Sequence, residues 1–498
     1  MKYSTLKNKN IFKKSFKVLV LSLILTIAPT FTVANNAVSN LPDLGSTAEN
    51  ILSPKLADKI GAAFIRQARS QMKFVEDPIL LDYLNTLGNK LVIAATSGTK
   101  NENQKFTFHL VEDQSLNAFA VPGGHIVVHT GLIIDSKNEP QLAATLAHEI
   151  AHITENHSGR GIENSKYDSA IAIASILVAV ASGDPKAAQA AIAASQGGLI
   201  QKRLNYTRGF EREADNKAII TLNKAGYHPT ALSNFLRILD RRQNLSGANP
   251  PAFLLTHPLT SERISETELR AKSYPAKTSR SNTQAFKDFK AFLAVEFHEK
   301  PSKIANYYRI NKGAFNDSSD HFKYGLALAK LDRYQDAEQQ LLLAIDADPK
   351  NLNYFIALNE LDVARRNYSS AAGRYEQLKK SDPTSYNKVA IYHANTLITA
   401  KSNELAIPVL AEVINTHPED PLARILMARA YGELGLLFKS YQERAYYHYL
   451  RGNLSFSIKQ LDNALSLAPN NLEKKKIKAL KAQYKDEQQK TESALKKL

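Results

Sequence analysis

Two histidines and a glutamate have the spacing of a metal site in the motif His148-Glu149-x-x-His152. On a helix, residues i and i+4 project from one face, so His148 and His152 can share a tetrahedral metal ion. Glu149 would then lie beside a water molecule on that ion and could take its proton. The chain contains no cysteine, so any metal must be held by His, Asp or Glu side chains.

The residues before this motif predict the helix that it needs. Asn138 can cap the N-terminus of a helix, with Gln141 three residues later completing the cap. Apolar residues then repeat at helical spacing, at Leu142, Leu146 and Ile150. This apolar stripe predicts that the helix is buried at the positions of the two histidines. It argues against the alternative, a surface helix with two solvated histidines.

A catalytic zinc ion needs a third protein ligand, and the candidates lie about sixty residues downstream. Glu211 and Asp215 are four residues apart and share a helix face, so one can bind metal while the other orients a ligand or donates a proton. Glu213 is expected to point elsewhere. His157 does not complete the extended HExxHxxGxxH pattern that supplies a third histidine. A charged helix face with internal Arg–Glu pairs remains the alternative.

Two strand-like segments precede the motif. Residues 105–111 and 125–129 predict strands, and a Pro-Gly-Gly turn lies between them. We expect the strand after Gly124 to offer its edge to an extended substrate, with Asn117, Gly123 and Gly124 as candidate contacts.

The C-terminal part of the chain carries an internal repeat. Pro349, Pro383 and Pro418 are 34 and 35 residues apart, and small residues recur ahead of each proline. A period of 34 residues is typical of tetratricopeptide repeats (TPR), helix pairs that bury their apolar faces by stacking on one another. An ordinary helical bundle whose prolines end its helices is the alternative.

The N-terminus predicts a secretory signal peptide. Six lysines precede or border the apolar run 18–27, and the small residues at 32–34 suit cleavage after Ala34. The run is short against the ~20 apolar residues that cross a bilayer, which disfavours the alternative of a membrane anchor. Cleavage would lower the net charge from +16 to +10, with 58 basic against 48 acidic residues. Because the remaining basic residues are dispersed and no groove-reading motif is present, nucleic-acid binding is not expected.

These motifs resemble the M48 family of zinc metallopeptidases. In that family an HExxH helix is followed by Glu-x-Glu-Ala-Asp, as at 211–215, and preceded by Asn-Ala-Phe-Ala-x-Pro-Gly-Gly, as at 117–124. The resemblance implies the following site in this sequence: zinc ligands His148, His152 and Glu211, catalytic Glu149, and proton donor Asp215.

The resemblance extends to residues 256–263, Thr-His-Pro-Leu-Thr-Ser-Glu-Arg. In a relative of this kind, a loop histidine near the zinc can occupy the open metal position and hold the enzyme off. The resemblance therefore makes His257 a candidate autoinhibitory zinc ligand. A loop histidine that caps a helix is the alternative.

The expected organisation follows from these motifs. It comprises a signal peptide (1–34), an α+β, mostly helical, zincin-type M48 metalloprotease domain (35–272), a polar linker (273–283), and an all-α TPR superhelical domain with a basic C-terminal cap (284–498). Two apolar segments, 170–181 and 186–194, are too short to span a membrane. We expect them to pack against the metal domain; the alternatives are a cover over the active site or peripheral contact with the bilayer surface.

An export signal, an M48 domain and TPRs together resemble envelope members of the family that serve outer-membrane protein assembly. The resemblance implies a periplasmic endopeptidase with one Zn²⁺ per subunit, which assists β-barrel assembly and degrades misassembled clients. The implied partners are unfolded or misassembled outer-membrane proteins and, through the TPRs, the outer-membrane β-barrel assembly machinery. The alternative function is a TPR chaperone or scaffold with latent or minor protease activity.

Overall fold

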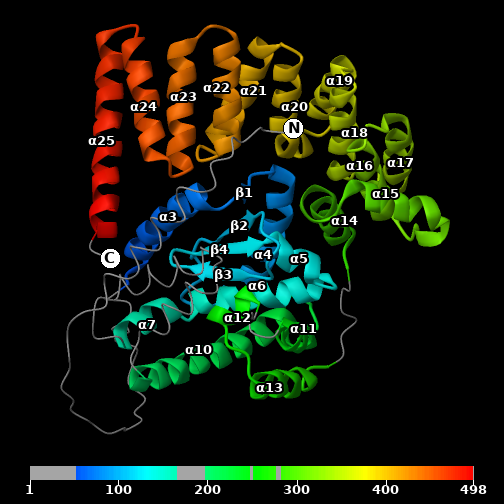
Figure 1. Cartoon of the computed structure of the whole chain (residues 1–498), viewed down its shortest axis with the longest axis vertical. Helices are drawn as coiled ribbons and strands as arrows, with labels where there is room; N and C mark the ends of the chain where they lie inside the picture. The colour runs from blue at the N-terminus through cyan, green and yellow to red at the C-terminus, as the bar shows by residue number, and fades with distance from the viewer. Residues whose placement is uncertain (1–51, 165–196, 247–250, 276–281, 497–498) are drawn as a thin grey trace.

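The computed structural model describes residues 52–164, 197–246, 251–275 and 282–496. The expected signal peptide and the apolar segments 170–181 and 186–194 lie outside these residues. No helix among the described residues is long and apolar enough to cross a membrane. Figure 1 shows a small sheet with helices on both faces, and an arc of paired helices beside it.

A four-stranded sheet lies at the centre of the first part. Its strands are β1 (Phe74–Val75), β2 (Thr107–Val111), β3 (Ala118–Val121) and β4 (His125–His129), in the order β1-β2-β4-β3. β2 and β4 are parallel, whereas β1 and β3 are antiparallel to their neighbours. The strands predicted at 105–111 and 125–129 are confirmed.

The expectation that the strand after Gly124 offers a free edge is wrong. The turn folds β4 back between β3 and β2, so both of its edges are hydrogen-bonded. Gly123 and Gly124 serve this turn, both with φ of +81°, and a Cβ on Gly124 would lie 1.9 Å from the carbonyl oxygen of Lys105. Asn117 is buried, and its carbonyl accepts the N–H of His129. The outer edge belongs to β3, which pairs with β4 alone among the described strands.

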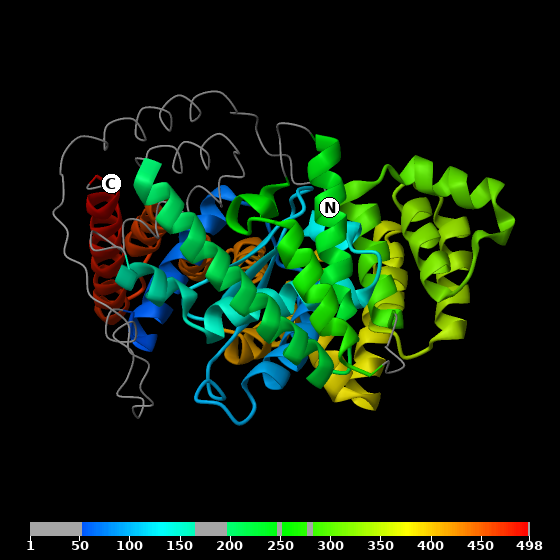
Figure 2. The ribbon, with the colours of Figure 1, turned by 90° about the horizontal axis from the view of Figure 1, so that it is seen from below.

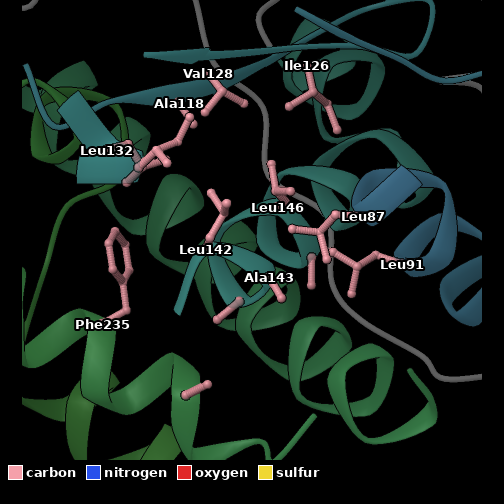
Figure 3. Packing of buried hydrophobic residues seen from close by; sticks show 14 of the residues in the cluster. Leu87, Leu91, Ala118, Ile126, Val128, Leu132, Leu142, Ala143, Leu146 and Phe235 are labelled. Carbon is pink, nitrogen blue, oxygen red and sulfur yellow. The ribbon is translucent and has the colours of Figure 1, made fainter. Parts of the chain in front are cut away.

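Helices cover both faces of this sheet. The helices of this part are α3 (Pro54–Gln71), α4 (Pro78–Thr96), α5 (Thr130–Asp135), α6 (Glu139–Thr154), α7 (His157–Asn164), α10 (Gly197–Lys224), α11 (Thr230–Ser246), α12 (Ala252–Thr256) and α13 (Ser261–Lys272). Successive side chains of β4 point to opposite faces of the sheet, so this strand contributes to an apolar core on each face. Ile126 and Val128 pack with Leu146 of α6 (Figure 3), while Val127 packs with Ile65 of α3.

α6, which carries the HExxH motif, begins and is buried as predicted. Asn138 Oδ1 accepts the N–H of Gln141 at 3.1 Å, and Gln141 Oε1 accepts the N–H of Lys137 at 2.8 Å. Every residue of α6 from Glu139 to Ala151 is buried. The two histidines therefore do not lie on a solvated surface helix.

The second part is a stack of helix pairs. Its helices are α14 (Gln284–Leu293), η1 (Ala294–His298), α15 (Pro301–Ile310), η2 (Lys312–Ala314), α16 (Ser318–Ala329), α17 (Tyr334–Ala347), α18 (Leu352–Ala364), α19 (Tyr368–Ser381), α20 (Pro383–Thr399), α21 (Asn403–Thr416), α22 (Pro421–Glu433), α23 (Leu437–Leu450), α24 (Leu454–Ser466) and α25 (Asn471–Lys496). Asp332, Arg366, Lys401 and Gly435, each with positive φ in a turn between helices, are 34, 35 and 34 residues apart. This regular turn geometry confirms the TPR architecture.

The two parts pack against each other over several contacts. Ile79 of α4 belongs to the apolar cluster built by α18–α22, and Phe286 and Phe289 of α14 belong to the core around α6. Arg66 of α3 forms an ion pair of 2.7 Å with Glu487 of α25. Seen from below, α10 crosses the front of the molecule and the C-terminal repeat helices lie behind it (Figure 2).

Replacing Gly124 by alanine tests whether this turn is structural. Gly124→Ala is expected to lower the free energy of unfolding by about 3–5 kcal/mol, because it adds left-handed backbone strain to a clash with a carbonyl oxygen. Gly98→Ala is the matched control, since Gly98 has φ of +71° but no atom lies within 4 Å of the place that its Cβ would take. It should cost only about 1–2 kcal/mol. Equal losses in urea denaturation would contradict the packing role of Gly124.

Candidate metal centre

Three elements bring four ligand atoms together. His148 and His152 come from α6, Glu211 from α10, and His257 from the residue that ends α12. These side chains each offer one ligand atom, and the atoms lie within 4.8 Å of one another. The Nε2 atoms of His148 and His152 are 3.0 Å apart. Glu211 lies opposite, with Oε2 3.3 Å from Nε2 of His148 and Oε1 3.4 Å from Nε2 of His152.

His257 turns its ring into this group. Its Nδ1 lies 3.0 Å from Oε1 of Glu211 and 3.3 Å from Nε2 of His148. The ring stacks on Phe253 with centroids 4.3 Å apart, and its backbone N–H bonds to the carbonyl of the same residue. His257 thus ends α12 through its backbone while its buried side chain lies among the ligand atoms.

Glu149 is fully buried beside these ligands. Neither of its carboxylate oxygens has a hydrogen-bond partner among the described residues, and Oε1 lies 3.4 Å from Nε2 of His257. Burial raises the pKa of Glu149 to about 8, and the negative charge of Glu211 adds to the rise. Burying a carboxylate with so little compensation is costly, so Glu149 fits a place beside a cation and a polarised water molecule.

Asp215 lies behind His148 rather than among the ligand atoms. Its Oδ1 is 3.0 Å from Nδ1 of His148, and Arg263 binds both carboxylate oxygens, Nε to Oδ2 at 2.8 Å and Nη2 to Oδ1 at 2.9 Å. Burial alone would raise the pKa of Asp215, but Arg263 and His148 hold that pKa below its ordinary value. An ionised carboxylate has no proton to donate. The geometry therefore favours orientation of His148 over the proton-donor role that the resemblance implied.

The donor set suits a divalent metal ion. Imidazole nitrogens and a carboxylate oxygen are ligands that zinc accepts in catalytic sites. Glu211 is ready to bind as an anion, because His257, Arg263 and His148 outweigh burial and hold its pKa well below the ordinary value. The residues present thus fit a metal held by His148, His152 and Glu211.

Comparison with known proteins agrees with this geometry. Residues 82–271 match peptidase family M48. The chain is 30% identical over 434 residues to the β-barrel assembly-enhancing protease of Yersinia pestis, covering 85% of this chain and 87% of that protein. It is 31% identical over 423 residues to the putative β-barrel assembly-enhancing protease of Vibrio cholerae, covering 81% and 83%. The Escherichia coli K12 protease of the same name is 30% identical over 476 residues, covering 91% and 93%.

The chain belongs to peptidase family M48. It is a metalloendopeptidase, and its site is metal-dependent. The relatives match nearly all of its length, so the likeness extends through the helical repeat as well as the M48 part.

Sequence reasoning missed Arg263, which ties the site together. Besides Asp215, its guanidinium reaches Oε2 of Glu211 at 2.9 Å and the carbonyl of Pro258 at 2.8 Å. Thr260 caps α13 by accepting the N–H of Arg263, and this sets the residue in the first turn facing α10. Two signals were available, since Arg263 ends the segment 256–263 covered by the resemblance and follows an N-cap threonine by three residues. The partners of that arginine, however, are distant in sequence.

Replacing Arg263 by methionine tests this ionic contact. Arg263→Met is expected to cost about 3–5 kcal/mol of unfolding free energy, because it leaves buried carboxylates without their compensating charge. Arg212→Met is the matched control: Arg212 joins the same two helices through a 3.1 Å pair with Glu262, but both side chains are exposed. It should cost at most about 1 kcal/mol. Similar losses for both variants in urea denaturation would contradict the role of Arg263.

Proposed function

We propose that this chain is a periplasmic zinc endopeptidase that acts on outer-membrane β-barrel proteins, assisting their assembly and degrading misassembled ones. The observation that carries the catalytic part is the convergence of His148, His152 and Glu211 beside the buried carboxylate of Glu149. Zinc is the proposed metal because two imidazoles and one carboxylate form a typical catalytic zinc donor set.

The chain's own residues supply the proton transfers and the orientation. His148, His152 and Glu211 would hold the zinc ion, which would supply Lewis acidity toward a water molecule and a peptide carbonyl. Glu149 would take the proton of the attacking water and return it to the leaving amine. Oδ1 of Asp215 lies 3.0 Å from Nδ1 of His148, close enough to orient that ring so that Nε2 would be its metal-binding atom.

The edge of β3 is the proposed docking line for an extended substrate. β3 runs beside α6, and its outer edge has no partner among the described strands. Backbone addition at such an edge would bind an unfolded segment with little dependence on its sequence. Segments destined for a transmembrane barrel are extended and alternate in polarity, which suits this mode.

The export signal and the relatives support the setting and the partners. Residues 1–34 have the composition of a secretory signal peptide. The relatives that match over most of the chain are named β-barrel assembly-enhancing proteases. We therefore assign unfolded or misassembled outer-membrane proteins as clients and the β-barrel assembly machinery as a partner of the TPR part.

A second candidate function is a TPR chaperone or scaffold with a latent protease. The placement of His257 favours latency, because its Nδ1 lies among the atoms that would surround the metal. Zinc held by four protein side chains has no position left for water, as in structural sites. In the proposed enzyme, His257 is thus an autoinhibitory ligand that must leave before cleavage.

Removing the proposed general base distinguishes the endopeptidase function from the scaffold function. Glu149→Gln is expected to retain zinc but to lower the rate of client cleavage about 10²–10⁴-fold, because the attacking water loses its proton acceptor. Glu155→Gln, at the end of the same helix and 3.0 Å from Lys217, is the control and should cleave normally. Zinc is measured by elemental analysis, and cleavage with an unfolded barrel protein. Full repair of an envelope defect by Glu149→Gln would favour the scaffold.

Removing the fourth ligand tests latency. His257→Ala is expected to speed cleavage of unfolded protein about tenfold. A preference of about 1.4 kcal/mol for the state in which His257 binds the metal would slow the wild-type chain by that factor. Its zinc content should stay at one ion per chain, since three ligands remain. His417→Ala removes an exposed histidine of the repeat and is the control. Unchanged cleavage by His257→Ala would remove the autoinhibitory role.

A further inference from the structure

The second metal-binding histidine has an outer partner that the catalytic scheme does not use. His157, the first residue of α7, places its Nδ1 2.9 Å from Nδ1 of His152. Its other nitrogen, Nε2, lies 3.1 Å from Oε2 of Glu213 on α10. We propose that His157, anchored by Glu213, positions the His152 imidazole for the metal. The inference rests on the proposed zinc centre and names a residue that supports it.

The nitrogen pattern fixes one direction for the protons. His152 turns Nε2 toward His148 and Glu211, so Nε2 is its metal-binding atom and Nδ1 carries its hydrogen. That hydrogen is donated to Nδ1 of His157, which must then carry its own hydrogen on Nε2 and donate it to Glu213. Each of these two hydrogen bonds then has one donor and one acceptor. The two hydrogen bonds therefore fix both the tautomer and the ring angle of His152.

The ring of His157 is itself held firmly. It is 5% exposed and stacks on Phe210 of α10, with centroids 4.3 Å apart and planes 19° apart. Arg160 binds Oε2 of Glu213 at 2.8 Å and lies over the ring of Phe210. Stacking on Phe210 thus sets the plane of the His157 ring, and the hydrogen bond to Glu213 sets the direction of its Nε2 atom.

α10 supplies matching support to both metal-binding histidines. Oδ1 of Asp215 lies 3.0 Å from Nδ1 of His148, and Glu213 reaches Nδ1 of His152 through His157. Glu213 lies two residues from the ligand Glu211 and points away from the metal, as the sequence predicted, so His157 bridges the remaining distance. One turn of α10 then provides a ligand and the outer partners of the other two.

The test compares zinc affinity with the stability of the metal-free chain. His157→Phe keeps the ring that stacks on Phe210 but removes both hydrogen bonds, and is expected to weaken zinc binding about 10–100-fold. His157→Asn can place an acceptor oxygen near the position of Nδ1 and should recover most of that loss. Glu213→Gln, at a half-exposed site, should weaken binding about threefold, since it replaces a charged acceptor by a neutral one.

His393→Phe is the matched control. His393 of α20 is also buried and stacked on an aromatic ring, that of Tyr375, but it belongs to the helical repeat and contacts none of the metal-binding residues. It should leave zinc affinity unchanged. Affinity is measured by competition with a chromophoric chelator, ligand geometry by the visible spectrum of the Co²⁺-substituted chain, and stability by the melting temperature of the metal-free chain.

The outcomes separate this inference from the zinc centre itself. Weaker zinc binding and an altered Co²⁺ spectrum in His157→Phe, with an unchanged metal-free melting temperature and recovery in His157→Asn, would support it. Wild-type affinity in both His157→Phe and Glu213→Gln would overturn it while leaving the zinc centre intact. Equal losses in His157→Phe and His157→Asn, with a lower metal-free melting temperature, would assign His157 a packing role only. A wild-type chain without zinc affinity would overturn the zinc centre first.

Discussion

The burial of three carboxylates in one small volume is the constraint on which the site depends. Glu149, Glu211 and Asp215 are 0%, 1% and 2% exposed. Anions so close together and removed from water repel one another strongly unless positive charge or hydrogen-bond donors compensate them. Arg263 supplies part of that compensation by binding two of the three, and the remaining carboxylate, Glu149, lies where a metal ion would supply the rest. A metal ion bound here would therefore stabilise the fold around α6 as well as the reaction.

The same buried network reaches the loop that carries His257. Arg263 bonds to the carbonyl of Pro258, the residue after His257, while Phe253 stacks on the ring of His257 from the other side. The loop that carries His257 is thus attached to the guanidinium that holds the buried carboxylates.

The parts that sequence could predict were those set by local spacing. The cap at Asn138, the apolar stripe of α6 and the 34-residue period each depend on residues near one another in the chain, and each was found as predicted. The free edge of β4 was predicted wrongly because its second partner, β2, is parallel and lies before the turn. Arg263 and His157 were given no supporting role from sequence because the carboxylates that they bind, Asp215 and Glu213, are brought to them by tertiary packing.

Packing crosses the polar segment that separates the two parts in sequence. α14 follows residues 273–283, yet Phe286 and Phe289 lie in the core around α6. α4 precedes the metal site, yet Ile79 lies in the core of the repeat while Leu87 and Leu91 of the same helix pack around α6 (Figure 3). A single rigid helix thus contributes to both cores. Separating the repeat from the M48 part would expose apolar side chains on each, so the repeat is a structural support of the metal site and not an appended module.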